Sequence, residues 1–252
     1  MSYFYIIAPR VSIIFGSLVA LLSLAGIFGN ALVIWAIVGS AEMRRSAMNL
    51  LLVNLALADS LFIVSNALAW IPRLLAGTAE WVLPEIMCPM VDYGLHTAVY
   101  ASILTYMAIS IERYLVIVHP MRKYSSAGAH SKEWKQRRNV LILCTAIWVL
   151  VAGWWALNAY MTRAWWTMRT GFQGFNSTIM TLSCTLRQSL FPMDPSGNHL
   201  YNVYNWLLRL TVWGTYVLAV GSTVVIYWRI CRVLWMRNNL IHHHMNAHSG
   251  GN

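Results

Sequence analysis

One carboxylate lies far inside an apolar stretch that carries no other charge: Asp59, at the end of the sequence LALAD. An ionised group is costly in hydrocarbon, so Asp59 is expected to face the interior of a helix bundle, beside water, an ion or a polar partner. A neutral, hydrogen-bonded structural aspartate is the alternative. Asn30 lies in a second apolar stretch and also needs partners for its amide. Gly26 and Gly29 would let the two helices approach closely, so we predict that Asn30 contacts Asp59.

A second group with possible chemistry is the triplet Glu112-Arg113-Tyr114, at the end of another apolar stretch. An acid next to a base at a membrane boundary can pair locally and hold the arginine in place. A shift driven by a ligand could then release it. The triplet alone is a weak signal, because adjacent charges are common at helix ends. The three adjacent histidines at 242–244 favour a solvated tail over a metal site, because no scaffold surrounds them.

Composition indicates that lipid is the solvent for much of the surface. Of the 252 residues, 58% are hydrophobic and only 10% are charged, whereas soluble domains carry about 25% charged residues. The net charge of +10 would suggest nucleic-acid binding in a soluble domain. Here the charges lie in short stretches between apolar runs, where Lys and Arg set membrane orientation instead. We therefore expect no nucleic-acid partner.

Five stretches are long enough to cross a hydrocarbon core of about 30 Å, which takes about 20 helical residues. Backbone amides in lipid need internal partners, so these stretches should be helices. The first is too long for a cleaved signal peptide and lacks a basic leader. We predict an all-α membrane protein with a transmembrane domain at 1–232, a cytosolic tail at 233–252, and helices at about 11–38, 46–75, 87–118, 137–162 and 203–232.

The distribution of positive charge predicts the topology. Of the 18 Lys and Arg residues, twelve follow the first, third or fifth stretch and six lie on the other side. Cytosolic loops are enriched in Lys and Arg, so the N-terminus is expected outside and the C-terminus in the cytosol. The sequon at Asn176 then lies outside and gives mild support, as a candidate glycosylation site. Cys88 and Cys184 also lie outside, where oxidation can join them, and we expect Cys144 and Cys231 to be free.

The motifs together resemble the rhodopsin family of G-protein-coupled receptors. The resemblance covers residues 11 to about 232 and depends on the order and the spacing of its signatures. Cys88 lies 25 residues before Arg113, and a tryptophan lies seven residues before that cysteine. The residues that match are Asn30, the LALAD run ending at Asp59, Trp81, Cys88, Glu112-Arg113-Tyr114 followed by Val118-His119-Pro120-Met121, Trp148, Cys184 and Tyr227.

The resemblance implies the first five helices of a seven-helix bundle, with helices 6 and 7 lacking. It implies a Cys88–Cys184 disulfide that ties the long loop after the fourth helix to the third helix. It also implies a switch and G-protein contact made of Glu112, Arg113, Tyr114, Pro120, Met121 and Tyr227. Asp59 and Ser102 match two positions of a sodium site, and their oxygens suit a hard cation. Read alone, Ser102 would bond its own helix backbone.

Three positions depart from the family pattern. Ala219 stands where the fifth helix usually has proline, Tyr106 stands where leucine is usual, and the outer end of the fourth helix has no proline. Without helices 6 and 7, Asp59 would lose most of its expected ion ligands. We therefore expect that the 252 residues alone do not couple agonist binding to G-protein activation.

The expected ligand is an extracellular peptide. Amine receptors of this family place an aspartate 18 residues before the switch arginine, and this sequence has Leu95 there. The rest resembles receptors of the galanin, allatostatin, somatostatin and opioid type. The candidate ligand-binding residues are Trp81, Asp92, Leu95, His96 and Val99. The alternative is that these side chains simply lie at the membrane interface, a depth that aromatic residues favour.

The sequence leaves two alternative functions for the protein. One is a peptide receptor in the plasma membrane whose chain is incomplete here, with a heterotrimeric G protein and membrane lipid as partners. The other is a non-signalling five-helix product that associates with a full-length receptor or retains it in the endoplasmic reticulum. A transporter would show paired halves with broken helices, which this sequence lacks. No enzyme activity and no cofactor other than a sodium ion is expected.

Overall fold

The computed structural model describes residues 9–78, 80–118, 129–170, 178–186 and 199–249. Five helices in these ranges are long and apolar enough to cross a membrane, which confirms the predicted fold class. A short hairpin of strands interrupts them. The elements are α1 (Pro9–Gly39), η1 (Met43–Arg45), α2 (Ala47–Leu75), α3 (Met87–Val118), α5 (Ala129–Met161), β1 (Thr162–Thr170), β2 (Thr178–Leu186) and α6 (His199–Ser249).

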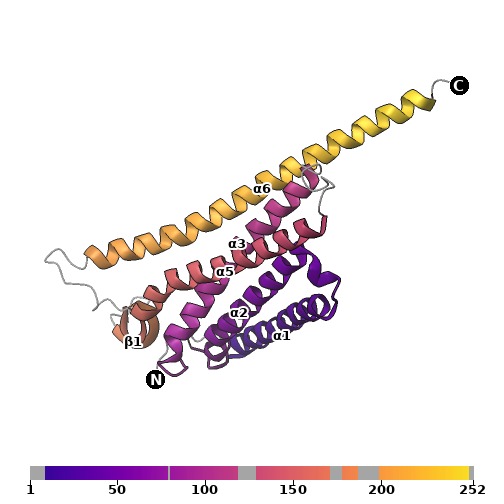
Figure 1. Ribbon diagram of the computed structural model, residues 1–252. Coiled ribbons are helices and arrows are strands. Elements are labelled where there is room, and N and C mark those ends of the chain that lie inside the picture. The colour runs from indigo at the N-terminus through magenta and orange to yellow at the C-terminus, as the bar shows by residue number, and fades with distance from the viewer. Residues whose placement is uncertain (1–8, 79, 119–128, 171–177, 187–198, 250–252) are drawn as a thin grey trace.

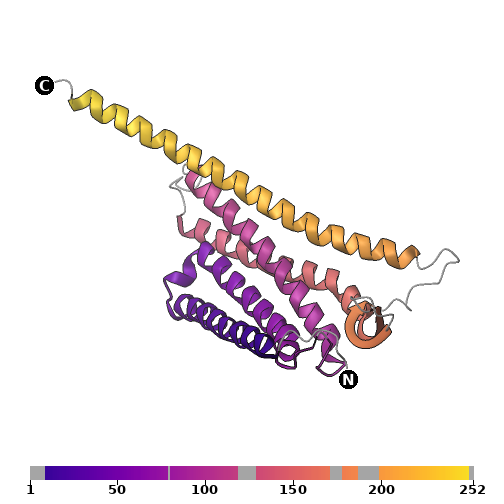
Figure 2. The same ribbon diagram turned by 180° about the vertical axis from the view of Figure 1, so that it is seen from behind.

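The helices pack in sequence around α3. α1 contacts α2, while α2, α5 and α6 each contact α3. Figure 1 shows α1 and α2 on one side of α3 and α6 on the other, and Figure 2 shows the same order from behind. The strands β1 and β2 lie at the end of the bundle where α3 begins, which we call the hairpin end. The far part of α6 extends beyond the other helices at the opposite end.

Two helices extend beyond the bounds that hydropathy predicted. α5 begins at Ala129 instead of about 137, and α6 runs from His199 to Ser249 instead of 203–232. Hydropathy marks where lipid ends, but a helix continues until a residue breaks it. No proline or glycine lies between Gly221 and Gly250, so α6 meets no strong helix breaker there.

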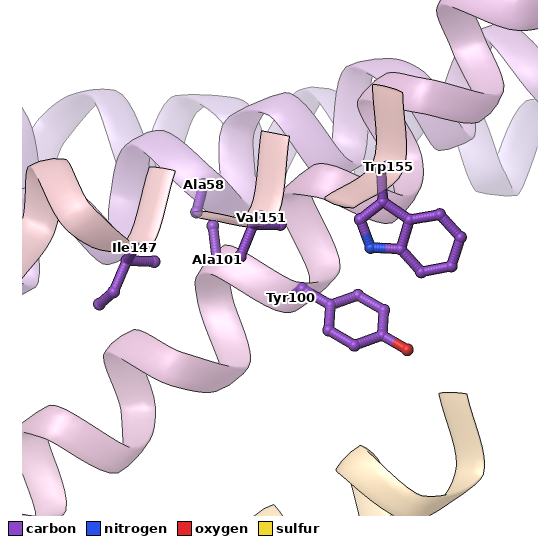
Figure 3. Close-up of a cluster of buried hydrophobic side chains, with 6 residues drawn as sticks. All are labelled: Ala58, Tyr100, Ala101, Ile147, Val151 and Trp155. Atoms are coloured by element: carbon purple, nitrogen blue, oxygen red, sulfur yellow. The ribbon is translucent and has the colours of Figure 1, made fainter. Parts of the chain in front are cut away.

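The largest buried cluster joins α2, α3 and α5. Ala58 of α2 and Ala101 of α3 are fully buried, and they pack against Ile147, Val151 and Trp155 of α5. Tyr100 lies beside Trp155 at one end of this cluster (Figure 3). The small alanine side chains let three helices meet without voids. The outward faces are apolar and exposed, in α1 above all, as a lipid-facing surface requires.

A glycine leaves room for a side chain of α2 against α3. A Cβ atom on Gly94 would lie 2.5 Å from Ser65 Oγ, a distance that no real contact allows. The sequence predicts that Gly26 and Gly29 let α1 and α2 approach closely, and the structure supports this for Gly26 but not for Gly29. A Cβ on Gly26 would lie 2.8 Å from Ile63 Cδ1 of α2, whereas Gly29 has no atom within 4 Å.

Replacing Gly94 with alanine is expected to destabilise the protein by about 1–3 kcal/mol, the usual cost of an added methyl group in a packed interior. Ser65→Ala in the same chain should restore most of the loss, because the next atom, Ser65 Cβ, would be 3.6 Å away. The measurement is the thermal unfolding midpoint of the purified protein in detergent.

Gly153→Ala is the matched control, since a Cβ there meets no atom within 4 Å and alanine favours the helix. Equal midpoints for G94A and G153A, or a G94A defect that Ser65→Ala does not relieve, would contradict this contact.

Candidate functional site

A disulfide fixes the hairpin to the start of α3. Cys88 and Cys184 are bonded, with an S–S distance of 2.06 Å, which confirms the predicted pair. β1 and β2 are antiparallel, and Cys184 stands opposite Ala164 in the register. The same end of α3 is held by a second contact, because the Trp81 backbone N–H donates to the Leu182 carbonyl at 2.8 Å. The hairpin is thus tied to α3 by a covalent bond and to the preceding loop by a hydrogen bond.

Trp81 contributes to this attachment through its backbone and its packing. Its side chain is only 4% exposed and packs with Cys88, Val91 and Leu182. Its indole N–H donates to the Pro84 carbonyl at 3.3 Å. A side chain buried under the hairpin has little surface to offer, and the contact of Trp81 with a ligand stays a prediction.

A cavity of about 400 Å³ opens at the hairpin end between α3, α5 and α6. We call it the α3–α5–α6 cavity. Two predicted residues, Asp92 and His96, lie in its wall. Aromatic and apolar side chains make up much of the rest. Its lining residues among those described are Asp92, His96, Trp155, Asn158, Thr162, Asn205, Leu208, Arg209, Val212 and Trp213.

Asp92 is the centre of a polar cluster on the α3–α5 wall. Its Oδ2 atom accepts a hydrogen bond from Asn158 Nδ2 at 3.0 Å and lies 3.3 Å from the Thr162 hydroxyl. That hydroxyl also lies 2.9 Å from the Asn158 carbonyl. Asn158 and Thr162 are buried. The carboxylate is thus stabilised by donors from α5 and from the first residue of β1, which is what a charge at membrane depth requires.

His96 is held in one orientation by Asp92 and Trp155. Its Nδ1 atom lies 2.9 Å from the Asp92 backbone carbonyl and 3.4 Å from Asp92 Oδ1. Both neighbours are acceptors, so Nδ1 carries the hydrogen. The imidazole stacks on the Trp155 ring, with centroids 4.3 Å apart and planes inclined by 26°. A fixed ring of this kind can present its other nitrogen to a bound molecule.

Two other predicted ligand-binding residues do not line the cavity. Leu95 and Val99 lie on α3 but are not among its lining residues, and Val99 instead packs against the main buried cluster. The sequence reading also missed Asn158, although a signal was present. Asn158 is an amide inside an apolar stretch, and a polar group there faces the bundle interior. Trp155 shares its helix face, three residues away, and Thr162, four residues further along the chain, begins β1.

The structure joins Asp59 and Ser102 as expected but leaves Asn30 apart. Ser102 Oγ donates to Asp59 Oδ1 at 2.7 Å across the α2–α3 interface. Within the described residues, Asn30 makes no hydrogen bond to Asp59.

A second interior amide, Asn54, was overlooked in the sequence. Asn54 Nδ2 donates to Thr105 Oγ1 at 2.7 Å, and Asn54 Oδ1 accepts from Trp148 Nε1 at 2.9 Å. This chain of bonds links α2, α3 and α5 one turn or so from Asp59. Its signal was again an amide in an apolar stretch, and the matched Trp148 supplies the indole donor.

At the end opposite the hairpin, the acid of the Glu112-Arg113 pair is engaged from another helix. Gln136 Nε2 of α5 donates to Glu112 Oε1 at 2.7 Å. Arg113 is exposed, and within the described residues it makes no ion pair, so the expected local pairing is not seen. Tyr227 is 46% exposed on α6. Pro120, Met121 and Asn176 lie outside the described residues.

The helix order, the disulfide and the interior polar pairs define a receptor bundle. The chain belongs to the rhodopsin family of seven-transmembrane receptors, because the model of that family matches residues 29–249. This confirms the resemblance inferred from the sequence signatures.

Several of its relatives are named as peptide receptors. Neuropeptide receptor 15 of Caenorhabditis elegans is 32% identical over 221 residues, which cover 86% of this chain and 58% of that protein. Galanin receptor 2a of Danio rerio is 32% identical over 139 residues, covering 55% and 36%. The tachykinin-like peptides receptor 86C of Drosophila melanogaster is 28% identical over 229 residues, covering 89% and 39%. The chain thus spans between 36% and 58% of the length of these relatives.

The disulfide determines how many cysteine thiols can react with maleimide. The chain has four cysteines, of which Cys144 and Cys231 are free. Maleimide should therefore add two labels to the oxidised protein unfolded in denaturant, and four after reduction, as read from the intact mass. Cys88→Ser with Cys184→Ser should give two labels with or without reductant. Four labels without reductant would show that the bond is absent.

Proposed function

We propose that this protein binds an extracellular peptide at the α3–α5–α6 cavity and acts as a neuropeptide receptor that signals through a heterotrimeric G protein. The observation that carries the proposal is the cavity itself, in a chain of the rhodopsin family whose relatives are named for peptides. A volume of about 400 Å³ falls in the range of small-molecule sites. It would take one or two side chains of a peptide, whose remainder would lie over the hairpin.

The lining supports a peptide over a free amine. Asp92 already receives donors from α5 and lies beside His96. Aromatic side chains, Trp155 and Trp213, flank this polar cluster, and Trp anchors of this kind dominate the energetics of peptide and protein recognition.

For membrane placement, we propose that the hairpin end faces outside and the opposite end faces the cytosol, in the plasma membrane. The charge distribution of the loops supports this orientation, and the exposed apolar faces of the helices suit contact with lipid. Arg113, Tyr227 and the neighbouring ends of α3 and α6 would then meet the G protein. Asn176 would be available for glycosylation.

The test is peptide binding to intact cells that express the chain with an N-terminal epitope tag. The panel holds galanin, tachykinin-like peptides, angiotensin II, and amidated and cyclic peptides. Trp213→Ala should lower the affinity by about tenfold or more, because the loss of a central aromatic anchor costs about 2 kcal/mol. Trp213 is 66% exposed, so the substitution should leave folding intact.

Trp235→Ala is the matched control, a tryptophan of the same helix that is 67% exposed and lies far from the cavity. Antibody staining of the tag without permeabilisation reports orientation and delivery to the surface. A chain that reaches the surface and binds no peptide, or binds with no difference between W213A and W235A, would refute the proposed site. Binding without nucleotide exchange on a purified G protein would favour the alternative of a non-signalling partner of another receptor.

We also propose that Asp59 and Ser102 hold a sodium ion. Their carboxylate and hydroxyl oxygens are the donors that hard cations prefer, and they already lie together across α2 and α3. With only two such donors, water would complete the coordination, so the effect should be modest.

Exchange of potassium chloride for sodium chloride at equal ionic strength is expected to raise the thermal midpoint by a few degrees, since a ligand present at several times its Kd adds about 1 kcal/mol. Asp59→Asn should abolish the difference. Glu85→Gln, which removes an exposed carboxylate near the start of α3, should leave it unchanged. Equal midpoints of the wild-type chain in both salts would exclude the sodium site.

A further inference from the structure

Two opposite charges face the α3–α5–α6 cavity from different walls. Asp92 belongs to α3, on the wall shared with α5, and Arg209 belongs to α6. No ion pair joins them, although both line the same space. Apart from His96, the other described lining residues are uncharged. The cavity therefore holds one carboxylate, one guanidinium and one imidazole.

The carboxylate is already provided with partners. Asn158 donates to it at 3.0 Å, the Thr162 hydroxyl lies 3.3 Å away, and the His96 ring lies 3.4 Å from its second oxygen. These groups come from the protein itself and are fixed by burial or by stacking on Trp155. Asp92 therefore needs no ligand to be stabilised.

The Arg209 guanidinium has no such partners among the described residues. Within the described residues, Arg209 makes no ion pair and no hydrogen bond, and its contact is with the face of Trp206, 5.9 Å from the ring centroid. Arg209 lies ten residues after the start of α6, its side chain is exposed, and it lines the cavity. An exposed guanidinium that makes no ion pair among the described residues can bind an anion that enters the cavity.

We propose that Arg209 is the anchor for a carboxylate of the ligand, with an aromatic side chain of the ligand beside Trp155 and Trp213. This deepens the proposed peptide-receptor function and rests on it. Arginine presents a planar fork of donors that matches a carboxylate in two parallel hydrogen bonds. The carboxylate is either the C-terminus of the peptide or the side chain of an acidic residue next to an aromatic one.

The positions of Arg209 and Asp92 determine whether a charged ligand gains or loses affinity in the cavity. A ligand anion on Arg209 gains from the guanidinium and is weakly repelled by Asp92. A ligand cation would have the opposite preferences. Substitutions at the two positions therefore separate the two ligand classes, whichever peptide is the natural one.

The first experiment uses small probes and the full chain in nanodiscs of phosphatidylcholine, with empty nanodiscs as the blank. The probes are N-acetyl-L-phenylalanine, its amide, and phenethylamine, and binding is measured by saturation-transfer NMR. The acid should bind about tenfold or more tightly than the amide, because hydrogen bonds to a charged group are worth at least that factor. Phenethylamine should bind least.

Variants then assign the preference to a residue. Arg209→Gln should remove the preference for the acid and leave amide binding unchanged, and Arg209→Lys should keep part of it, since lysine retains the charge but loses the fork. Asp92→Asn should strengthen binding of the acid. Arg10→Gln, an exposed arginine at the start of α1, is the matched control and should change nothing.

Equal binding of acid and amide by the wild-type chain would overturn the inference, with no need for any variant to fold. So would an acid preference that survives in R209Q, or tightest binding of phenethylamine that disappears in Asp92→Asn. For a peptide found in the cell assay, free-acid and amidated versions distinguish the C-terminus from an acidic side chain as the source. A peptide whose binding depends on Trp213 but not on Arg209 would overturn this inference and leave the proposed receptor function standing.

Discussion

The packing of α3 against every neighbouring element is the constraint on which the rest of the structure depends. α2, α5, α6 and β1 all contact α3, whereas α1 reaches the bundle through α2. Such crowding is feasible only where α3 presents almost no side chain. Gly94, Ala98 and Ala101 are buried without remaining exposed surface or with very little. The small residues let backbones approach closely, and in lipid that approach supplies the attraction that hydrophobicity supplies in water.

The same helix distributes polar partners along the bundle axis. Asp92 accepts a hydrogen bond from Asn158 of α5. Ser102 donates to Asp59 of α2, and Thr105 accepts from Asn54 of α2. Each pair meets the same requirement, that a polar group surrounded by hydrocarbon must find its hydrogen-bond partner within the protein. The pairs also fix the rotation of each helix about its axis, since a helix turned away from α3 would leave its polar group in lipid. Packing thus sets how near the helices come, and polar pairs set which faces meet.

Much of this could be predicted from single residues, because membrane depth makes the rules strict. Hydropathy located all the spans, and the interior position of Asp59 followed from the cost of its charge. Hydropathy could not predict where the helices end, because α6 continues to Ser249, well beyond its apolar stretch. The hairpin of β1 and β2 was missed because its two nine-residue strands, which pair with each other, fall below the length of about 20 residues by which hydropathy detects a span. The burial of Trp81 beneath the hairpin could not be predicted, because a tryptophan near the membrane surface suits both ligand contact and packing, and only the fold determines which neighbours it has.

The cavity residues from α5 and α6 show a further limit of sequence reading. Asn158 can be recognised as interior, but its partner Asp92 lies 66 residues away, and no local spacing joins them. Once the pairs are known, the residues outside them become informative. Arg209 at the hairpin end and Arg113 at the opposite end are among the exposed arginines that make no ion pair within the described residues. Interior pairs stabilise the bundle irrespective of any ligand. An arginine without a counter-ion contributes little to stability and keeps its full attraction for an anion or a dipole from outside. Among the described residues, the interhelical polar pairs thus lie along the length of the bundle, and exposed arginines without a counter-ion lie toward its two ends.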